Sequence, residues 1–271
     1  MRQLLLLLTF IVLIVSCVKE SPLEQPSKPK LKKTLSYYSL DKSKLQGMVT
    51  YEYDNNSNLT KISSFYQDTI YPLIYFTYDY ENGKKVRENV YNAMGDSYNL
   101  SQIYTFFYSN NLLTKKELRN PVFADVLSYT EYKYDKNGNL ILEARIQPDP
   151  YICWKTEYQY DSNNLKIKTL NFFEDQTPGG YVDHFYVGSR LSNEKFYGGN
   201  DKLYCESNYV YDSENNLIVI TQTREGESKV IESNRYENSL IVEKTSYEWL
   251  YVTYHGEPKY SFKYVQIYKY E

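Results

Sequence analysis

Residues 132–140 read YKYDKNGNL, and this stretch decides the fold. Tyr132 and Tyr134 alternate with Lys133, as residues do on a strand whose two faces differ. The run KNGN that follows contains Asn and Gly, which tolerate the positive φ angles of a tight hairpin turn. From Leu140 the alternation resumes in LILEARI, as on a returning strand. The stretch therefore predicts a β-hairpin.

The same pattern recurs along the chain at a regular period. Each copy begins with an aromatic residue, a spacer residue, a tyrosine and usually an aspartate. A polar turn and an aliphatic residue follow. The tyrosines of the eight copies, called the anchor tyrosines, are separated by 25, 30, 26, 26, 26, 25 and 25 residues. They are Tyr53, Tyr78, Tyr108, Tyr134, Tyr160, Tyr186, Tyr211 and Tyr236. So constant a period predicts tandem β-hairpins.

Eight hairpins predict an all-β antiparallel sheet, with a further terminal pair of strands at about 247–254 and 260–270 joined by a turn at 255–258. The tyrosine-bearing face must be covered, and a twisted or rolled sheet covers it by turning it inward. Side chains could not fill a closed barrel of this many strands. We therefore expect an elongated, twisted or rolled sheet, with a two-layer sandwich as the alternative. Many outward-facing Lys and Glu residues argue against an outer-membrane barrel.

The N-terminal residues predict export and a lipid anchor. Residues 1–16 combine Arg2 with an apolar stretch too short for a spanning helix, as in a signal peptide. The segment 14–17, IVSC, resembles the lipobox of bacterial lipoproteins, which implies that Cys17 is lipidated. By the same resemblance, the lack of Asp at Val18 favours the outer membrane of a Gram-negative bacterium, on its periplasmic face or at the cell surface. Residues 17–36 are rich in Pro and Lys and predict an extended tether, which leaves 37–271 as the β domain.

Residues 134–140, YDKNGNL, resemble the signature of the RHS or YD-repeat family, YDxxGNL. The resemblance spans about residues 50–240, but the other copies replace the glycine or shorten the turn. In large members of the family, such repeats form a curling β-sheet shell around a toxin and precede a self-cleaving core region. Nothing after Tyr236 is similar to that core region. The resemblance therefore implies the repeat architecture alone, in the short form of small envelope lipoproteins.

Composition and motifs argue against several functions. The chain has 33 Tyr but only 2 His and 3 Cys, and its formal net charge of −3 argues against nucleic-acid binding. The motifs GxSxG, Walker A, HExxH and CxxC are absent from the sequence. We therefore expect no enzyme, no cofactor and no metal. The aspartates that follow anchor tyrosines are expected to cap their own turns rather than to bind calcium.

Few residues stand out as ligand contacts. His184 and Asp183 are neighbours on a predicted strand, point to opposite faces and make a poor catalytic pair. The speculative ligand contacts are Trp154, Trp249 and Tyr251, together with the irregular segments 177–180 and 197–200. Disulfides persist in the envelope, but Cys153 and Cys205 are 52 residues apart, which is two periods or four strands. Four strands span about 19 Å, too far for a disulfide, so we expect both cysteines to stay unbridged.

These features together predict a lipid-anchored envelope protein that is held at the membrane by its anchor. We expect its repeat sheet to present a binding surface for a protein partner. A carbohydrate-binding surface lipoprotein is the alternative, and a glycan-processing hydrolase is the least favoured interpretation.

Overall fold

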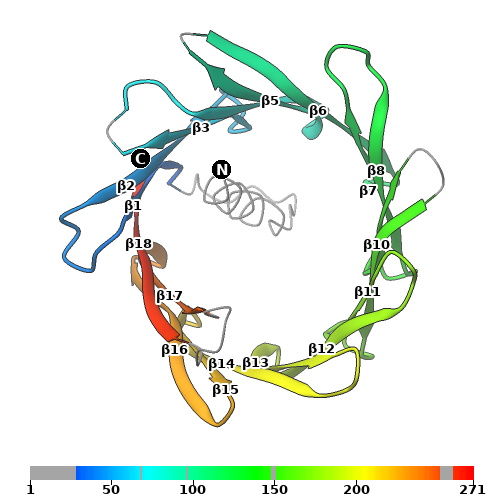
Figure 1. The fold of residues 1–271 in the computed structure, drawn as a ribbon, viewed down its shortest axis with the longest axis vertical. Helices are drawn as coiled ribbons and strands as arrows, with labels where there is room; N and C mark the ends of the chain where they lie inside the picture. Colours follow the sequence, from blue (N-terminus) through cyan, green and yellow to red (C-terminus); the bar gives the residue numbers. More distant parts are fainter. Residues whose placement is uncertain (1–28, 68, 96, 148–150, 251–258) are drawn as a thin grey trace. The chain divides into compact units, whose positions relative to one another are not determined.

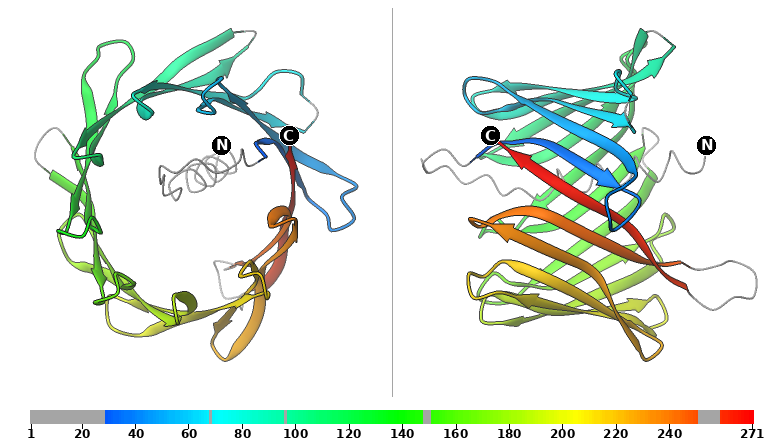
Figure 2. Two further views of the ribbon diagram at one scale, coloured as in Figure 1. Left: turned by 180° about the vertical axis from the view of Figure 1, so that it is seen from behind. Right: turned by 90° about the vertical axis from the view of Figure 1, so that its left-hand side faces the viewer.

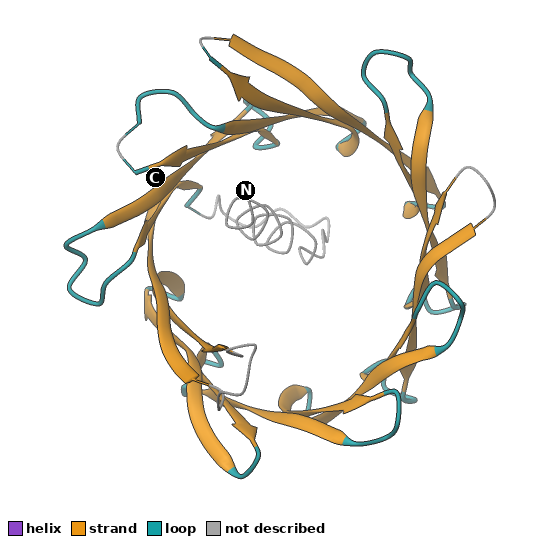
Figure 3. Cartoon of the chain, in the orientation of Figure 1, coloured by secondary structure: helices purple, strands orange, loops and turns teal. Residues whose placement is uncertain are grey.

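The structure, a computed structural model, describes residues 29–67, 69–95, 97–147, 151–250 and 259–271. Within it Leu31–Glu271 form one compact unit, which is described by itself below. The described residues form strands and connections, and none of their segments is a helix long and apolar enough to cross a membrane. The all-β prediction is therefore confirmed for this part of the chain (Figure 3).

Eighteen antiparallel strands follow one another around the unit. They are β1 Leu31–Tyr37, β2 Leu45–Tyr53, β3 Leu59–Tyr66, β4 Ile74–Glu81, β5 Lys84–Met94, β6 Ser97–Ser109, β7 Leu112–Arg119, β8 Val126–Tyr134, β9 Leu140–Gln147, β10 Tyr151–Tyr160, β11 Lys166–Phe172, β12 Pro178–Val187, β13 Arg190–Gly198, β14 Leu203–Tyr211, β15 Leu217–Arg224, β16 Glu227–Glu237, β17 Leu240–Leu250 and β18 Lys259–Tyr270. Each strand pairs with the next along the chain.

The sheet closes on itself, because β1 pairs with β18 as well as with β2 (Figure 1). The expected elongated, open sheet is therefore wrong, and the domain is a closed β-barrel. Closure removes the two edge strands that an open sheet would expose. Strand β1 begins at Leu31, so residues 31–36 belong to the barrel and not to the tether expected at 17–36.

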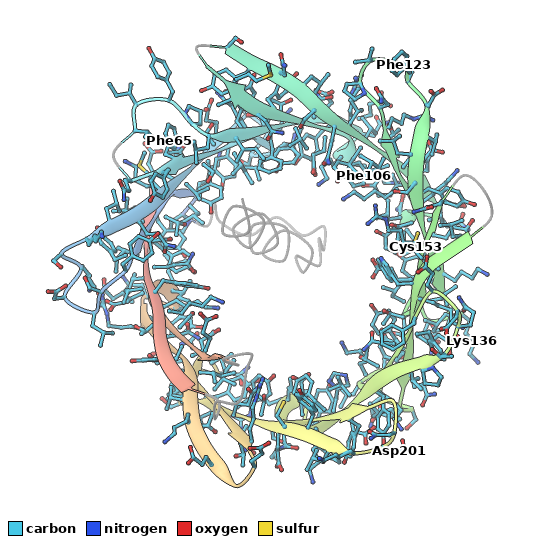
Figure 4. The ribbon with its side chains drawn as sticks, viewed as in Figure 1. Phe65, Phe106, Phe123, Lys136, Cys153 and Asp201 are labelled. Atoms are coloured by element: carbon cyan, nitrogen blue, oxygen red, sulfur yellow. The ribbon has the colours of Figure 1, made fainter. Side chains whose placement is uncertain are left out.

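Register and side-chain direction fix which residues face the lumen. Figure 4 shows Phe106 pointing into the ring and Phe65 pointing away from it. Because side chains alternate along each strand, the anchor tyrosines lie on the inner face with Phe106. The residue before each anchor is outward and exposed, as at Lys133 and Gln159. The expected inward turn of the tyrosine face is confirmed, although anchors such as Tyr134 are half-buried rather than fully covered.

The barrel is too wide for its wall to fill. Figure 2 shows the strands crossing the wall obliquely, and eighteen strands about 4.8 Å apart at a tilt of about 40° give a diameter of about 36 Å. Side chains of the wall do not reach the axis of such a barrel. Inner-face residues therefore range from buried ones, such as Phe106, to ones exposed to the lumen, such as Arg145.

Each hairpin carries a bulge at the second or third residue of its returning strand. Lys133 pairs with Leu142 and Tyr134 with Leu140, so that Ile141 is left without a partner in the register. Bulges increase the local twist and bend the strand, which lets the sheet curl into a closed wall. The equivalent residues are Thr60, Val86, Thr114, Ile141, Ile167, Ser192, Ile218 and Val242.

The bulge corrects one anchor position. In the second hairpin it lies between Asp79 and Tyr80, and Tyr80 pairs with Lys85. The structural anchor is therefore Tyr80, two residues beyond the predicted Tyr78. With this correction the first two spacings become 27 and 28 residues, closer to the other periods.

The aspartates after Tyr53, Tyr134, Tyr160 and Tyr211 close their turns, as predicted, whereas Asp79 lies within β4 and pairs with Arg87. Oδ1 of Asp135 accepts hydrogen bonds from the N–H groups of Asn137 at 2.8 Å and Asn139 at 2.9 Å. Its Oδ2 accepts one from Nδ2 of Asn139 at 2.9 Å. These bonds hold the pKa of Asp135 below its usual value. The two backbone bonds recur at Asp54, Asp161 and Asp212. The side-chain bond recurs at Asp54 and Asp212, where it comes from Asn58 and Asn216.

Consecutive repeats are joined by hydrogen bonds from the anchor tyrosines, called the inter-repeat bonds. The hydroxyl of Tyr134 donates to the carbonyl of Leu113, the residue that pairs with the preceding anchor, Tyr108. Among the described residues, five bonds of this kind are Tyr53 to Leu31 at 3.0 Å, Tyr108 to Lys85 at 2.9 Å, Tyr134 to Leu113 at 2.9 Å, Tyr160 to Leu140 at 2.9 Å and Tyr186 to Lys166 at 3.0 Å.

The two ends of the barrel chain form a ninth repeat. Tyr270 on β18 pairs with Leu31 on β1, and the register skips Lys32, as at the bulge of every other hairpin. The carbonyl of Leu31 then accepts the inter-repeat bond of Tyr53. Strands β18 and β1 thus have the structure of a hairpin without a covalent turn, and the eighteen strands are nine equivalent pairs.

The two ends of the barrel differ chemically. The turn rim comprises the Asp- and Asn-rich connections 54–58, 82–83, 110–111, 135–139, 161–165, 188–189, 212–216 and 238–239, with Leu31 and Tyr270 beside them. The loop rim at the other end comprises the connections 38–44, 69–73, 120–125, 173–177, 199–202 and 225–226. In Figure 1 the loops after β1 (blue) and β7 (green) lie outside the ring of strands.

Candidate functional site on the inner wall

One row of inner-wall side chains combines two cations with a tryptophan. The register pairs Lys116 on β7 with Thr130 on β8, Thr130 with Arg145 on β9, and Arg145 with Trp154 on β10. All four share the inner face with Phe106, which pairs with Lys116. These four residues, called the Trp154 row, lie side by side across four neighbouring strands.

Neither cation of the row forms an ion pair with a described carboxylate. The Lys116 ammonium lies 4.1 Å from the ring centre of Tyr104 and 5.4 Å from that of Phe106. Burial lowers the pKa of Lys116; the charges of Glu88 and Glu143 oppose this lowering, and those of Lys85 and Arg145 add to it. Arg145 is exposed to the lumen, and its Nη2 donates to Oγ of Ser128 at 3.3 Å.

The carboxylates near the row are already engaged with other side chains. Glu88 accepts a hydrogen bond from Nζ of Lys85 at 3.1 Å. Glu143 accepts one from the hydroxyl of Tyr158 at 3.3 Å, and burial raises the pKa of Glu143. The charges of Lys85 and Glu88 cancel each other. The two cations of the row then face only one further carboxylate, that of Glu143. The local balance is therefore positive.

A second inner-wall cluster is a hydrogen-bonded chain across β11 to β14. Oγ1 of Thr169 lies 2.9 Å from Nε2 of His184, and Nδ1 of His184 lies 2.7 Å from Oε1 of Glu194. The hydroxyl of Tyr209 donates to the other oxygen of Glu194. Burial alone would raise the pKa of Glu194, but hydrogen bonds from His184 and Tyr209 bring it below its ordinary value.

This chain has the order hydroxyl, imidazole, carboxylate that activates nucleophiles in hydrolases. Acyl transfer also needs donors for an oxyanion. Thr169 lies in β11 between β10 and β12, and its strand's backbone N–H groups are used in those two ladders. The geometry therefore supports a brace between four strands rather than a nucleophile.

The sequence did not reveal this brace. His184 was expected to lie on a strand with Asp183 on the opposite face, and the structure has both features, since Asp183 pairs outward with Lys195. The partner of His184 is Glu194, ten residues later on the next strand. The only available signal was the hairpin register, because 184 and 194 are equidistant from the turn once the bulge at Ser192 is counted.

Replacing Glu194 with Gln should reduce stability at neutral pH by about 1–3 kcal/mol, because two charge-assisted hydrogen bonds are lost. The pKa of Glu194 is lower in the folded protein than in the unfolded chain. Its contribution is therefore present above the unfolded pKa and is lost as the pH falls through the folded value. Urea unfolding at pH 7 and pH 3 should show a smaller acid destabilisation in the variant. Glu225→Gln, on the exposed β15–β16 turn, is the control, and equal pH profiles for Glu194→Gln and wild type would contradict the assignment.

Of the predicted aromatic ligand contacts, the structure describes Trp154 and the backbone of Trp249. Trp154 lies in the row on β10, whereas Trp249 lies on β17, where its backbone pairs with Tyr260. The side chain of Trp249, and all of Tyr251 and Cys17, lie outside the described residues. Lys116 and Arg145, which stand beside Trp154, were not identified from the sequence.

The segments 177–180 and 197–200 were expected to be irregular loops, but most of their residues extend β12 and β13. Gly180 pairs with Gly198, and the rings of Tyr181 and Tyr197 stack with their centres 4.6 Å apart. A Cβ atom at Gly180 would lie 2.4 Å from the carbonyl oxygen of Tyr197, so glycine is required by the close approach of the strands.

Both cysteines of the barrel are free, as predicted. Cys153 occupies a bulge on β10, and Cys205 is buried on the inner face of β14. The two strands are four positions apart in the wall, which keeps the thiols apart even though the sheet is closed.

Comparison with known proteins gives structural likenesses but no match in sequence. No protein-family model matches the sequence, and none of the curated proteins matches it. Among solved structures, the chain is similar to a porin-like protein from Bacteroides uniformis (TM-score 0.48, 10% identity, 91% of this chain and 99% of that one). A porin-like protein from Bacteroides vulgatus has a TM-score of 0.39 at 12% identity, over 90% of this chain and 99% of that one. The TcdB2–TccC3 structure has a TM-score of 0.37 at 11% identity, over 84% of this chain and 15% of that one. At these values the likenesses say nothing about function.

Proposed function

We propose that this protein is a non-enzymatic, lipid-anchored envelope protein whose barrel binds a protein partner through its loop rim. The observation that carries the proposal is the exposure of large apolar side chains there. Ile70 and Tyr71 are 85% and 76% exposed, and Val122 and Phe123 are 78% and 73% exposed. Exposed apolar patches of this kind mark interaction sites, and aromatic residues are enriched in protein interfaces.

The turn rim supplies the contrast. Its connections are built from Asp, Asn, Ser and Gly, whose polar groups close the turns themselves. The chain also enters the barrel at this rim, because Leu31 pairs with Tyr270. A lipid at Cys17 would be joined to the turn rim by the thirteen residues 18–30. The shortest arrangement turns the polar rim to the bilayer and leaves the apolar rim for a partner.

The outer wall supports anchoring rather than membrane insertion. Ion pairs lie on the outer face in mid-strand, between Lys155 and Glu157 at 2.9 Å and between Lys168 and Asp183 at 3.4 Å. Lipid would penalise the two lysines by about 2–4 kcal/mol each near the bilayer centre, and the carboxylates by less. We infer that the barrel is held at the outer membrane by its lipid, with its wall in water.

Site-specific photocrosslinking in the native host tests the rim. A benzoylphenylalanine placed at Phe123 should give one discrete adduct with a protein, whereas the same probe at Val187, beside the turn rim, should give none. Adding Ile70→Asp should abolish the adduct at position 123 while the barrel stays folded. Equal adducts at both rims, or no adduct at Phe123, would contradict a partner at the loop rim.

The anchor is tested separately. Metabolic labelling with a fatty acid should mark the wild-type protein, and Cys17→Ala should remove the label and release the protein from the membrane fraction. Labelling that persists in the variant would contradict lipidation at Cys17.

A further inference from the structure

We propose that the Trp154 row is a binding site for an acidic sugar, with a uronate ring stacked on Trp154 and its carboxylate held by Arg145 and Lys116. The site is on the inner wall and does not depend on the loop rim. A failure of this proposal therefore leaves the protein-partner proposal intact, and the reverse also holds.

The two positive charges of the row favour an anionic ligand. Lys116 has its ammonium against the faces of Tyr104 and Phe106 and has no described carboxylate within ion-pair distance. Arg145 is exposed and makes a neutral hydrogen bond to Ser128. Two cations facing the same lumen at a separation of two strands, about 10 Å between backbones, repel each other. An anion between their long side chains would relieve that repulsion and would form charge-assisted hydrogen bonds.

The neighbours of the row determine the sign of the ligand. Lys85 compensates Glu88 at 3.1 Å. Glu143 lies two residues from Arg145 and is held by the Tyr158 hydroxyl at 3.3 Å, and burial raises the pKa of its carboxyl. The Glu143 carboxylate repels a ligand that carries several negative charges, but it can accept hydrogen bonds from sugar hydroxyls. A ligand with one carboxylate and many hydroxyls fits this combination better than a polyanion does.

The indole of Trp154 favours a ligand with a sugar ring. It is half-buried beside Arg145 on the inner face, and the wall's side chains leave room toward the axis. An indole stacks on flat, weakly polar surfaces, such as the face of a sugar ring. Thr130 and Thr156 share the inner face with Trp154 and add hydroxyl groups at the edge of that surface. The row thus offers a stacking platform, cations and hydroxyls together.

Calorimetry on the full chain in detergent micelles tests the site, with hexagalacturonate as the probe and its methyl ester as the uncharged match. The acid should bind, and the ester should bind about a hundredfold more weakly, as the loss of two charged contacts of about 1.4 kcal/mol each implies. Added salt should weaken binding of the acid and leave binding of the ester unchanged. Binding of the acid should also quench tryptophan fluorescence, and Trp154→Phe should remove that quenching.

Variants separate the roles of the row. Arg145→Gln and Lys116→Gln should each lower the affinity for the acid about tenfold and the affinity for the ester by less than about twofold. Trp154→Ala should weaken binding of both the acid and the ester. Lys116→Arg should retain binding of the acid, which would show that the loss in Lys116→Gln comes from the missing charge and not from misfolding. Lys133→Gln, an exposed cation on the outer face, is the matched control and should change nothing. Equal affinity for acid and ester, no binding of the acid below about 1 mM, or loss of binding in Lys133→Gln would overturn the proposal.

Discussion

A chain that lacks residues 31–37 should not form a cooperatively folded barrel. These residues are strand β1, which pairs with β18 on one side and β2 on the other. Their removal opens two long edges at once, with unpaired backbone groups on β2 and β18, and such edges promote aggregation. Circular dichroism and gel filtration should show loss of the unfolding transition and a shift to large assemblies.

Removing seven residues upstream, 21–27, is the matched control and should leave the barrel intact. The sharper test is rescue. If β18 and β1 are the ninth repeat, residues 31–37 should also work when they follow Tyr270 through the turn sequence of residues 135–139, DKNGN. This rearranged chain should regain the unfolding transition. A stable monomer without residues 31–37, or a rearranged chain that stays aggregated, would contradict the closure.

The hairpins could be predicted because their determinants are local. Alternation, the Asp and Asn of the turns and the period of about 26 residues lie within one repeat. Closure depends instead on how twist and bulges accumulate over all the repeats. The ninth repeat was missed because its two strands lie at opposite ends of the sequence. One signal was present, since residues 268–270 read YKY, as residues 132–134 do.

The inner-wall site could be predicted only in part. Trp154 stood out because the chain has two tryptophans. Lys116 and Arg145 are common residue types, and only the register places them in one row with Trp154. Alternation counted back from Tyr160 places Trp154 on the inner face, whereas Arg145 reaches that face only because of the bulge at Ile141. Strand alternation counted from Leu140 without this bulge would place Arg145 on the outer face.

Replacing the five tyrosines of the inter-repeat bonds with phenylalanine should lower the free energy of unfolding by about 5 kcal/mol, at about 1 kcal/mol for each hydrogen bond. Each hydroxyl donates to a backbone carbonyl of the preceding repeat at 2.9–3.0 Å. The rings are half-buried and keep their packing as phenylalanine. The loss therefore reports the hydroxyl alone, and urea unfolding followed by circular dichroism measures it.

Two smaller variants make the test specific. The double variant Tyr134→Phe, Tyr160→Phe should lose about 2 kcal/mol, because it removes two consecutive bonds of the wall. The double variant Tyr91→Phe, Tyr129→Phe changes two outer-face tyrosines and should lose less than about 0.5 kcal/mol. Equal losses in the two pairs would mean that tyrosine hydroxyls in general, rather than the inter-repeat bonds, stabilise the barrel. Because these bonds connect neighbouring repeats and not distant ones, the losses in the five single variants should also add up to that of the fivefold variant.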